Sequence, residues 1–528
     1  MKKSYIDCLK DITADELYEG LLGYGMFTEK LPPIFTSHDF YQYCKNHKLG
    51  FNKNKGDGFI LYESMRNTSI PRTFGIPTPM KYEILCHTLK DNWDAILNVF
   101  EKNTKKSQYK VSRIHIRKRK GDKALIKINY ENNDDEDYIG LPTNLETEGN
   151  KKSLFNMNYK NWEEDGDPIT QFFLGKKYVV MTDISQCFPS IYTHSLCWAL
   201  AGKSIAKAHK KGDWYNDIDI ACQGMRNGET HGLLIGPHAS NLLSEIILTA
   251  VDKELIAQGY EYIRNIDDYT CYVESFEKAQ QFIVDLNSGL REYDLFLNHK
   301  KTMIKRLPQA ASESWIQKLK NTDPIGRYGV VDYKSAMAYL DVAVRVMKDN
   351  GNNASAIYYA IKVLGKKKIS NNAKICCVRT MCHLAVIYPY LVPIMDRYVF
   401  EAFNASQTDI EKFANILYHD SFLSKNYEGL SYALYFAIKY KFLINEISIK
   451  DIVSSSNCVY KVLSYVYFKT NNNKKALKEL KEDARSLKKD SFEENWLFIY
   501  EALPKSDMSG DWSCLKKQGI SFLVDKFT

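Results

Sequence analysis

The sequence predicts an α+β protein that ends in an all-helical domain. Two observations support this fold class. Between residues 71 and 325, apolar strand-like segments alternate with amphipathic helices. From Tyr333 onward, amphipathic helices of ordinary length follow one another and are separated by short polar turns. We therefore expect a helical N-terminal region at 1–70, an α+β domain at 71–325 and a helical-repeat-like domain at 326–528.

The composition excludes several classes of protein. The 528 residues are 45% hydrophobic with a net charge of +8, which allows a large core and is compatible with a nucleic-acid partner. The 12 cysteines include no Cys-x-x-Cys pair, so neither a zinc site nor a disulfide framework is indicated. The N-terminus lacks the apolar run of a signal peptide, and the longest apolar run, at 384–395, is too short to span a bilayer. We expect a cytosolic protein with no membrane partner.

Two strand-like segments come first in the α+β domain, one rich in proline and one in a basic stretch. A proline-punctuated extended segment occupies residues 71–80. The most basic stretch follows, and within it residues 111–117 alternate like a strand, which places Arg113 and Arg117 on one face. Such a face is either simply solvated or suited to bind an anion.

The next strand is predicted to end in a carboxylate. Residues 178–184 form a mostly apolar run with Asp183 near its end, the pattern of a buried strand with a polar residue at its mouth. A glycine-punctuated loop at 230–240 then precedes a strongly apolar helix at 241–256, which we expect to pack on the sheet. Residues 296–304 form another strand-like segment.

Two adjacent carboxylates, Asp267 and Asp268, lie at the tip of a predicted β-hairpin. Residues that favour strands flank the pair on both sides, at 260–263 and 269–273. Like charges at a turn are unfavourable for folding, but hard divalent cations such as Mg²⁺ bind one or two carboxylates together with substrate phosphates. The pair is therefore either a solvated turn or part of a metal site.

Taken in order, these segments resemble the palm of reverse transcriptases. The strands that carry Asp183 and Asp267 would then be neighbours in one antiparallel sheet. Asn265 stands where the Tyr-x-Asp-Asp box usually has an aromatic residue, and Ile235 stands where templated enzymes often have Gln. The matching segments are Arg72–Pro79 for the first finger motif, Thr182–Phe188 for the first acidic motif, Gly232–Ser240 for the template-facing motif, Asn265–Asp268 for the box and Leu297–Thr302 for the lysine-bearing motif.

A narrower resemblance points to bacterial antiphage enzymes. The segments Phe188–Ser195 and Ile235–His238, together with the helical C-terminal half, are similar to the abortive-infection and defence-associated reverse transcriptases related to AbiK. This resemblance implies a cytoplasmic bacterial enzyme that makes a DNA product from dNTPs. It also implies priming from a protein hydroxyl, and synthesis without a template or on an RNA template or noncoding RNA. The helical C-terminal half would either hold a noncoding RNA or the product, or form the surface of a homo-oligomer.

The resemblance assigns catalytic roles to four residues of an RNA-directed DNA polymerase. Asp183 and Asp267 would bind two Mg²⁺ ions, with the Ile184 carbonyl as a further ligand and Asp268 as a weaker third carboxylate. Lys301 would stabilise or protonate the leaving pyrophosphate, unless it is an ordinary surface lysine.

The resemblance also places residues around the incoming nucleotide. Phe188, five residues after Asp183, would lie beneath the ribose and exclude a 2′-hydroxyl, unless it is simply part of the palm core. Arg113 and Arg117 would clamp the triphosphate, and Gly236 would lie in the nucleotide-binding loop. The rival functions are a catalytically silent RNA-binding scaffold and an RNA polymerase built on the same palm.

Overall fold

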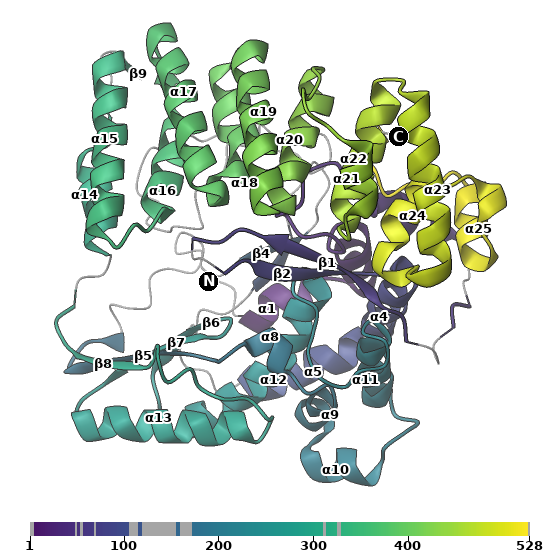
Figure 1. Ribbon diagram of the computed structural model, residues 1–528. Helices are drawn as coiled ribbons and strands as arrows, with labels where there is room; N and C mark the ends of the chain where they lie inside the picture. The colour runs from purple at the N-terminus through teal and green to yellow at the C-terminus, as the bar shows by residue number, and fades with distance from the viewer. Residues whose placement is uncertain are drawn as a thin grey trace.

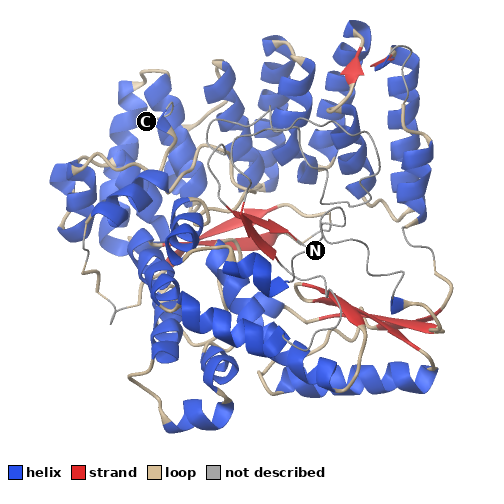
Figure 2. Ribbon diagram, turned by 180° about the vertical axis from the view of Figure 1, so that it is seen from behind, coloured by secondary structure: helices blue, strands red, loops and turns tan. Residues whose placement is uncertain are grey.

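The computed structural model describes residues 5–47, 50–52, 56–67, 70–104, 115–118, 155–158, 172–309, 313–324 and 329–525. Figure 1 shows a row of C-terminal helices, coloured green to yellow, lying over the strands and helices of the rest of the chain. In Figure 2 the strands fall into separate sheets, with the long helix α13 (Phe276–Arg291) running along one of them.

The N-terminal part combines short helices with a two-stranded antiparallel sheet. Thr13 begins the second helix through a capping box, because its side chain accepts a hydrogen bond from the backbone N–H of Glu16 and the Glu16 side chain returns the contact. The expected extended segment at 71–80 is confirmed as a strand from Arg72 to Pro77, after which a helix begins at Pro79. The elements are α1 (Tyr5–Lys10), α2 (Ala14–Tyr18), the π-helix η1 (Glu19–Gly23), α3 (His38–Asn46), β1 (Phe59–Ser64), β2 (Arg72–Pro77), α4 (Pro79–Asp91), α5 (Trp93–Thr104), β3 (His115–Lys118) and β4 (Phe155–Asn158).

A four-stranded antiparallel sheet forms the centre of the next part. Its strand order is β6-β7-β5-β8, so the strand that ends in Asp183 lies beside the strand that begins with Asp268. The expectation that these two strands are neighbours is therefore confirmed. The strands are β5 (Tyr178–Asp183), β6 (Tyr262–Asn265), β7 (Asp268–Val273) and β8 (Met303–Arg306).

Helices cover this sheet and join its strands. The helix α13 packs against β5 and β7, and α12 packs against α13, α5 and α9. The apolar helix expected at 241–256 is confirmed as α12, which is buried along most of its length. The connecting helices are α8 (Cys187–Ser190), α9 (His194–Ala201), α10 (Lys203–Ala208), α11 (Trp214–Gly224) and α12 (His238–Ala257).

The strand-like segment expected at 296–304 is wrong in its extent. The backbone N–H groups of Lys301 and Thr302 both donate to the Asn298 carbonyl, each at 3.1 Å, which closes a turn before the strand begins. Only Met303 and Ile304 of that segment lie in β8. The segment was thus expected to be a strand where local backbone hydrogen bonds favour a turn.

The C-terminal part is helical, as expected. Each long helix packs against its neighbours in the row, with contacts of α15 to α17, α17 to α19, α19 to α20 and α20 to α22. A short parallel pair of strands, β9 (Val330–Val331) and β10 (Lys368–Ile369), is added to the helices. The helices are α14 (Ser314–Asn321), α15 (Tyr333–Asp349), α16 (Ser355–Leu364), α17 (Asn371–Ile387), η4 (Pro389–Leu391), α18 (Val392–Met395), η5 (Asp396–Glu401), α19 (Gln407–Ser424), α20 (Tyr427–Tyr440), α21 (Ile449–Ser454), α22 (Cys458–Thr470), α23 (Lys474–Asp490), η6 (Glu493–Asn495), α24 (Trp496–Ala502), η7 (Lys505–Asp507) and α25 (Gly510–Lys517).

The proposed boundaries at 70/71 and 325/326 stay predictions. Across the described ranges, every helix is too short or too polar to cross a lipid bilayer.

The C-terminal helices are joined to the first sheet by a buried carboxylate. Glu428 of α20 is 1% exposed and accepts hydrogen bonds from the Ser64 hydroxyl and the Met65 N–H, each at 2.6 Å. The end of the chain returns to the N-terminal part, where the Thr36 N–H donates to the Phe522 carbonyl at 2.9 Å. The helical part is therefore attached to the rest of the molecule at several places, which also include the hydrogen bonds of Asn67 with Ser355 and of Tyr432 with the Lys30 carbonyl.

We predict that the stability of this contact depends on pH. Burial raises the pKa of Glu428 from 4.5 to about 7, so the folded protein favours the protonated side chain. This contribution to stability is complete below pH 4.5 and is lost as the pH rises to about 7, and it amounts to roughly 3 kcal/mol. The unfolding midpoint should fall over that range, and Glu428→Gln should flatten the fall.

The control for this prediction is Glu482→Gln, which removes an exposed carboxylate from α23. That variant should keep the pH dependence of the wild type. An equal slope in wild type and Glu428→Gln would show that another group titrates.

Candidate active site

The hairpin and the end of β5 bring the predicted carboxylates together. Asp183 is the register partner of Asp268 in the β5–β7 pair, and Asp267 occupies the turn between β6 and β7. The Ile184 N–H donates to the Asp267 carbonyl at 3.1 Å, so the backbone after β5 is tied directly to the turn. On the other side, the Asn298 N–H donates to the Asp183 carbonyl at 2.8 Å.

The three carboxylates differ in burial. Asp183 is buried, Asp267 is half-buried and Asp268 is exposed. Burial raises the pKa of Asp267, and the negative charge of Asp183 raises it further, while Lys301 and Arg72 oppose the shift. The folded protein therefore holds carboxylate charge where water does not fully solvate it.

Lys301 lies against these carboxylates. Its Nζ is 2.6 Å from Asp183 Oδ2, although the lysine side chain is 66% exposed. The hydrogen bond to Asp183 raises the pKa of Lys301, and the charges of Asp268 and Asp267 add to this effect. The neighbouring Lys300 is exposed on the same turn. The structure thus brings Lys301, as predicted, to the carboxylates.

A metal ion suits the pair formed by Asp183 and Asp267. Asp183 Oδ1 is buried and has no hydrogen-bond partner among the residues that the structure describes, so one strong acceptor in the site is left unsatisfied there. Within the described ranges no group of three or more His, Cys, Asp or Glu side chains is arranged to hold a metal ion. A pair is enough for Mg²⁺, which commonly binds one or two carboxylates and completes its shell with substrate phosphates and water. The full set predicted to hold metal, which also includes the Ile184 carbonyl and Asp268, stays a prediction.

Phe188 lies on a sharp turn after β5. Gln186 precedes it with a φ of 45°, in the left-handed region, and the short helix α8 follows. Phe188 is half-buried, and its carbonyl accepts a hydrogen bond from the Leu233 N–H at 2.8 Å. The backbone that carries Phe188 is therefore fixed to the loop at 232–237.

That loop packs against the fingers strand β2. The Gly75 N–H donates to the Ile235 carbonyl at 2.9 Å, and a Cβ on Gly75 would come within 2.7 Å of the Leu234 side chain. Gly236 has a φ of 124° and lies against Phe74 of β2. Gly236, predicted to lie at the nucleotide, thus packs on the protein's own fingers, and only glycine fits both contacts.

The structure describes some of the other predicted residues by their place in the fold. Arg117 is in β3, where its register partner is Asn156 of β4, and Arg113 lies outside the described residues. His238, expected to be structural, is buried at the start of α12, and burial lowers its pKa. His231, also expected to be structural, stacks on Tyr192 with ring centroids 4.9 Å apart.

The sequence did not single out Arg72 as a site residue, although it opens the predicted finger motif. Arg72 begins β2, and its charge lowers the pKa of Asp267. It also acts on Arg66, whose pKa is lowered by burial first and by Arg72 second. Arg72 therefore acts electrostatically on both Arg66 and Asp267.

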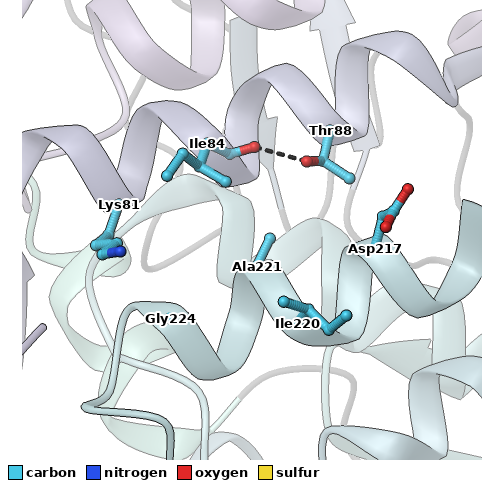
Figure 3. Close-up of a pocket in the computed structure, with 7 residues that line it drawn as sticks. All are labelled: Lys81, Ile84, Thr88, Asp217, Ile220, Ala221 and Gly224. Carbon is cyan, nitrogen blue, oxygen red and sulfur yellow. Dashed lines mark hydrogen bonds between the residues drawn. The ribbon is translucent and has the colours of Figure 1, made fainter. Parts of the chain in front are cut away.

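A small pocket between α4 and α11 lies apart from this cluster (Figure 3). The Thr88 hydroxyl donates to the Ile84 carbonyl at 2.7 Å on one wall. None of the predicted site residues lines it; the residues drawn are Lys81, Ile84, Thr88, Asp217, Ile220, Ala221 and Gly224. We assign it no role in the reaction.

Comparison with known proteins defines the class of this enzyme. Residues 93–340 match the reverse transcriptase (RNA-dependent DNA polymerase) family. The matched range contains the whole four-stranded sheet and therefore Asp183, Asp267, Asp268 and Lys301. The chain carries a reverse-transcriptase domain and is a nucleotidyltransferase. More particularly, it is an RNA-directed DNA polymerase with a helical C-terminal region.

Solved structures that match the chain include two telomerases. One is telomerase from Candida albicans in complex with a TWJ fragment of telomeric RNA, at 12% identity, covering 88% of this chain and 69% of that one with a TM-score of 0.27. The other is apo telomerase from Candida tropicalis, at 12% identity, covering 91% and 76% with a TM-score of 0.31. No curated protein matches this chain in sequence.

We predict that Asp267→Asn removes dNTP incorporation without unfolding the protein. The raised pKa of Asp267 means that its charge is unfavourable for folding above that pKa, so a neutral amide should keep or increase the unfolding midpoint. Incorporation should fall by more than about tenfold, or about 1.4 kcal/mol in the barrier. Asp183→Asn should behave in the same way.

The control is Asp294→Asn, at an exposed position with a φ of 62° that asparagine also tolerates. It should match the wild type in both measurements. Activity of Asp267→Asn within about tenfold of wild type would contradict the assignment of a metal to this carboxylate.

Proposed function

We propose that this chain transfers deoxynucleotides in a Mg²⁺-dependent reaction at Asp183 and Asp267. The observation that carries the proposal is the buried, unpartnered Oδ1 of Asp183 beside a second carboxylate whose pKa is raised. A 3′-hydroxyl, or a hydroxyl of the protein, attacks the α-phosphate of a dNTP and pyrophosphate leaves. Bound Mg²⁺ would activate the attacking hydroxyl and neutralise charge on the leaving group.

The cations of the site act on the phosphates. Lys301 keeps its proton because Asp183 raises its pKa, so it is available to neutralise or protonate the pyrophosphate. Arg72 is a further candidate to bind the triphosphate, because its charge already acts at Asp267, and the clamp by Arg113 and Arg117 stays a prediction. Guanidinium groups bind phosphate oxygens through two parallel hydrogen bonds.

Phe188 selects the sugar in this proposal. It follows the carboxylate strand directly, is only half-buried, and is fixed by its backbone to the loop at 232–237. An aromatic ring beneath the ribose leaves a 2′-hydroxyl without room or a hydrogen-bond partner, and burying an unpaired hydroxyl costs roughly 1–3 kcal/mol. The product is therefore DNA.

We further propose that synthesis does not follow ordinary processive copying of a template. Ile235 occupies the position where templated enzymes often have Gln, and its carbonyl is held by Gly75 of β2. The resemblance to antiphage enzymes supports priming from a protein hydroxyl, with or without an RNA template or noncoding RNA, in bacterial antiviral defence. The same resemblance supports abortive infection as the outcome and a homo-oligomer as the assembly.

We expect the purified chain to incorporate labelled dNTPs with Mg²⁺ and to lose this activity in EDTA. The product should be digested by DNase and resist RNase. If a protein hydroxyl is the primer, the label should partition with protein into phenol until protease releases it. The same assay on enzyme first treated with nuclease shows whether a template is needed, because incorporation should then be lost if it depends on copurified nucleic acid.

Two outcomes of this experiment would contradict the proposal. An absence of incorporation with any nucleotide would favour a catalytically silent RNA-binding scaffold. Preferential use of rNTPs by the wild type would move the assignment to an RNA polymerase on the same palm.

We predict that Phe188→Ala admits rNTPs while it keeps dNTP incorporation. Removal of the ring opens the space for a 2′-hydroxyl, and relief of a cost of roughly 1–3 kcal/mol corresponds to about a 5- to 150-fold gain in relative rNTP use. Incorporation of matched dNTPs and rNTPs should be measured side by side. Phe422→Ala, at a 45% exposed position on α19, is the control and should leave discrimination unchanged. Unchanged discrimination in an active Phe188→Ala protein would show that another residue reads the sugar.

A further inference from the structure

A fully buried arginine lies directly behind the active-site hairpin. Arg264 is the third residue of β6 and is 0% exposed. Two carboxylates of α12 surround its guanidinium. Nη1 and Nη2 donate to Glu245 at 3.0 Å each, and Nε and Nη2 donate to Asp252, the shortest of these bonds being 2.7 Å. Glu245 and Asp252 are seven residues apart, so they share one face of the helix.

One further hydrogen bond of Arg264 has a different partner. Nη1 also donates to the backbone carbonyl of Ile266 at 2.9 Å. Ile266 lies in the hairpin turn with a φ of 50°, a left-handed conformation that β-branched residues rarely adopt. Its carbonyl belongs to the peptide that leads into Asp267. The guanidinium therefore holds the peptide that orients the active-site carboxylate.

The contacts of Arg264 link the hairpin to the helix α12, which follows the loop at 232–237. The helix α12 begins immediately after the loop at 232–237, and its buried face carries the two partners of Arg264. The charge of Arg264 also acts on the residue before Phe188. Burial raises the pKa of Cys187, the residue before Phe188; the charge of Asp267 raises it further, and Arg264 opposes this. One rigid helix therefore supports both the loop and the turn.

We propose that Arg264 is a positioning residue for Asp267, holding the strained turn so that the carboxylate faces Asp183 and a bound cation. This inference rests on the proposed metal site. Arg264 touches neither the carboxylate nor a substrate, and it acts through the Ile266 carbonyl. Groups that orient metal ligands in this way commonly change metal affinity 10- to 100-fold when they are altered.

The test uses Arg264→Lys, which keeps the charge but cannot supply the five N–H donors of a guanidinium. Binding of Mn²⁺ to the full chain, without nucleotide, is measured by electron paramagnetic resonance, and the unfolding midpoint is measured in parallel. We expect Arg264→Lys to weaken Mn²⁺ binding at least about tenfold. We also expect it to lower kcat by a larger factor than it changes the KM for dNTP.

Two further variants separate positioning from stability. Lys461→Met removes another buried cation: Lys461 lies in the helical part, is 1% exposed, and its Nζ is 2.6 Å from Asp483 Oδ2. This variant should lower the unfolding midpoint and leave Mn²⁺ binding unchanged. Ile266→Gly, added to Arg264→Lys, lets the turn adopt its positive φ without help and should recover part of the Mn²⁺ affinity.

Each failure has a distinct signature. Asp267→Asn must lose Mn²⁺ binding, and if it does not, the proposed metal site itself is wrong. If Asp267→Asn loses the ion while Arg264→Lys binds it as tightly as wild type, only the role of Arg264 is overturned. An equal loss of Mn²⁺ affinity in Lys461→Met would also overturn it, because a general loss of stability would then be the cause.

Discussion

The antiparallel pairing of β5 with β7 is the constraint on which this active site depends. Its register sets Asp183 opposite Asp268 and leaves Asp267 at the turn. Side chains alternate along a strand, so a slip of one residue would turn Asp183 to the other face of the sheet. Backbone hydrogen bonds from Ile184 to the Asp267 carbonyl and from Asn298 to the Asp183 carbonyl hold the register on both sides.

That register brings the negative charges of Asp183, Asp267 and Asp268 to the same end of the sheet. Burial and the charge of Asp183 raise the pKa of Asp267, and cations from separate parts of the chain oppose this shift. Lys301 comes from the turn before β8, Arg72 from the fingers, and Arg264 balances two carboxylates behind the hairpin. Lys301 contacts Asp183 through Oδ2, and among the described residues Asp183 Oδ1 has no hydrogen-bond partner, which leaves it available to a cation. Clustered carboxylates lower the stability of the fold, but together with the nearby cations they suit the binding of a metal ion and of phosphates.

The helical part contributes to the position of the fingers. Glu428 accepts a hydrogen bond from Ser64, Ser64 is the register partner of Arg72, and the charge of Arg72 acts on Asp267. A series of contacts therefore runs from α20 to Arg72, and the charge of Arg72 acts on Asp267. The strand β2 is held from the other side by the loop at 232–237, through Gly75. The C-terminal helices thus support β2 through β1, and β2 also packs against the loop at 232–237.

The sequence by itself determined the strands that end in carboxylates, the apolar helix α12 and the all-helical C-terminal part. Local patterns suffice for these, because apolar periodicity and turn residues reflect short-range preferences. Pattern failed at 296–304, where the backbone of Asn298 closes a turn inside a segment expected to be a strand. Only the tertiary structure decided that Arg264 lies buried behind Asp267 and that Arg72 reaches the carboxylates. A charged side chain in a strand looks the same in sequence whether it is solvated or buried, because its partners, Glu245 and Asp252, are set by how a distant helix packs on the sheet.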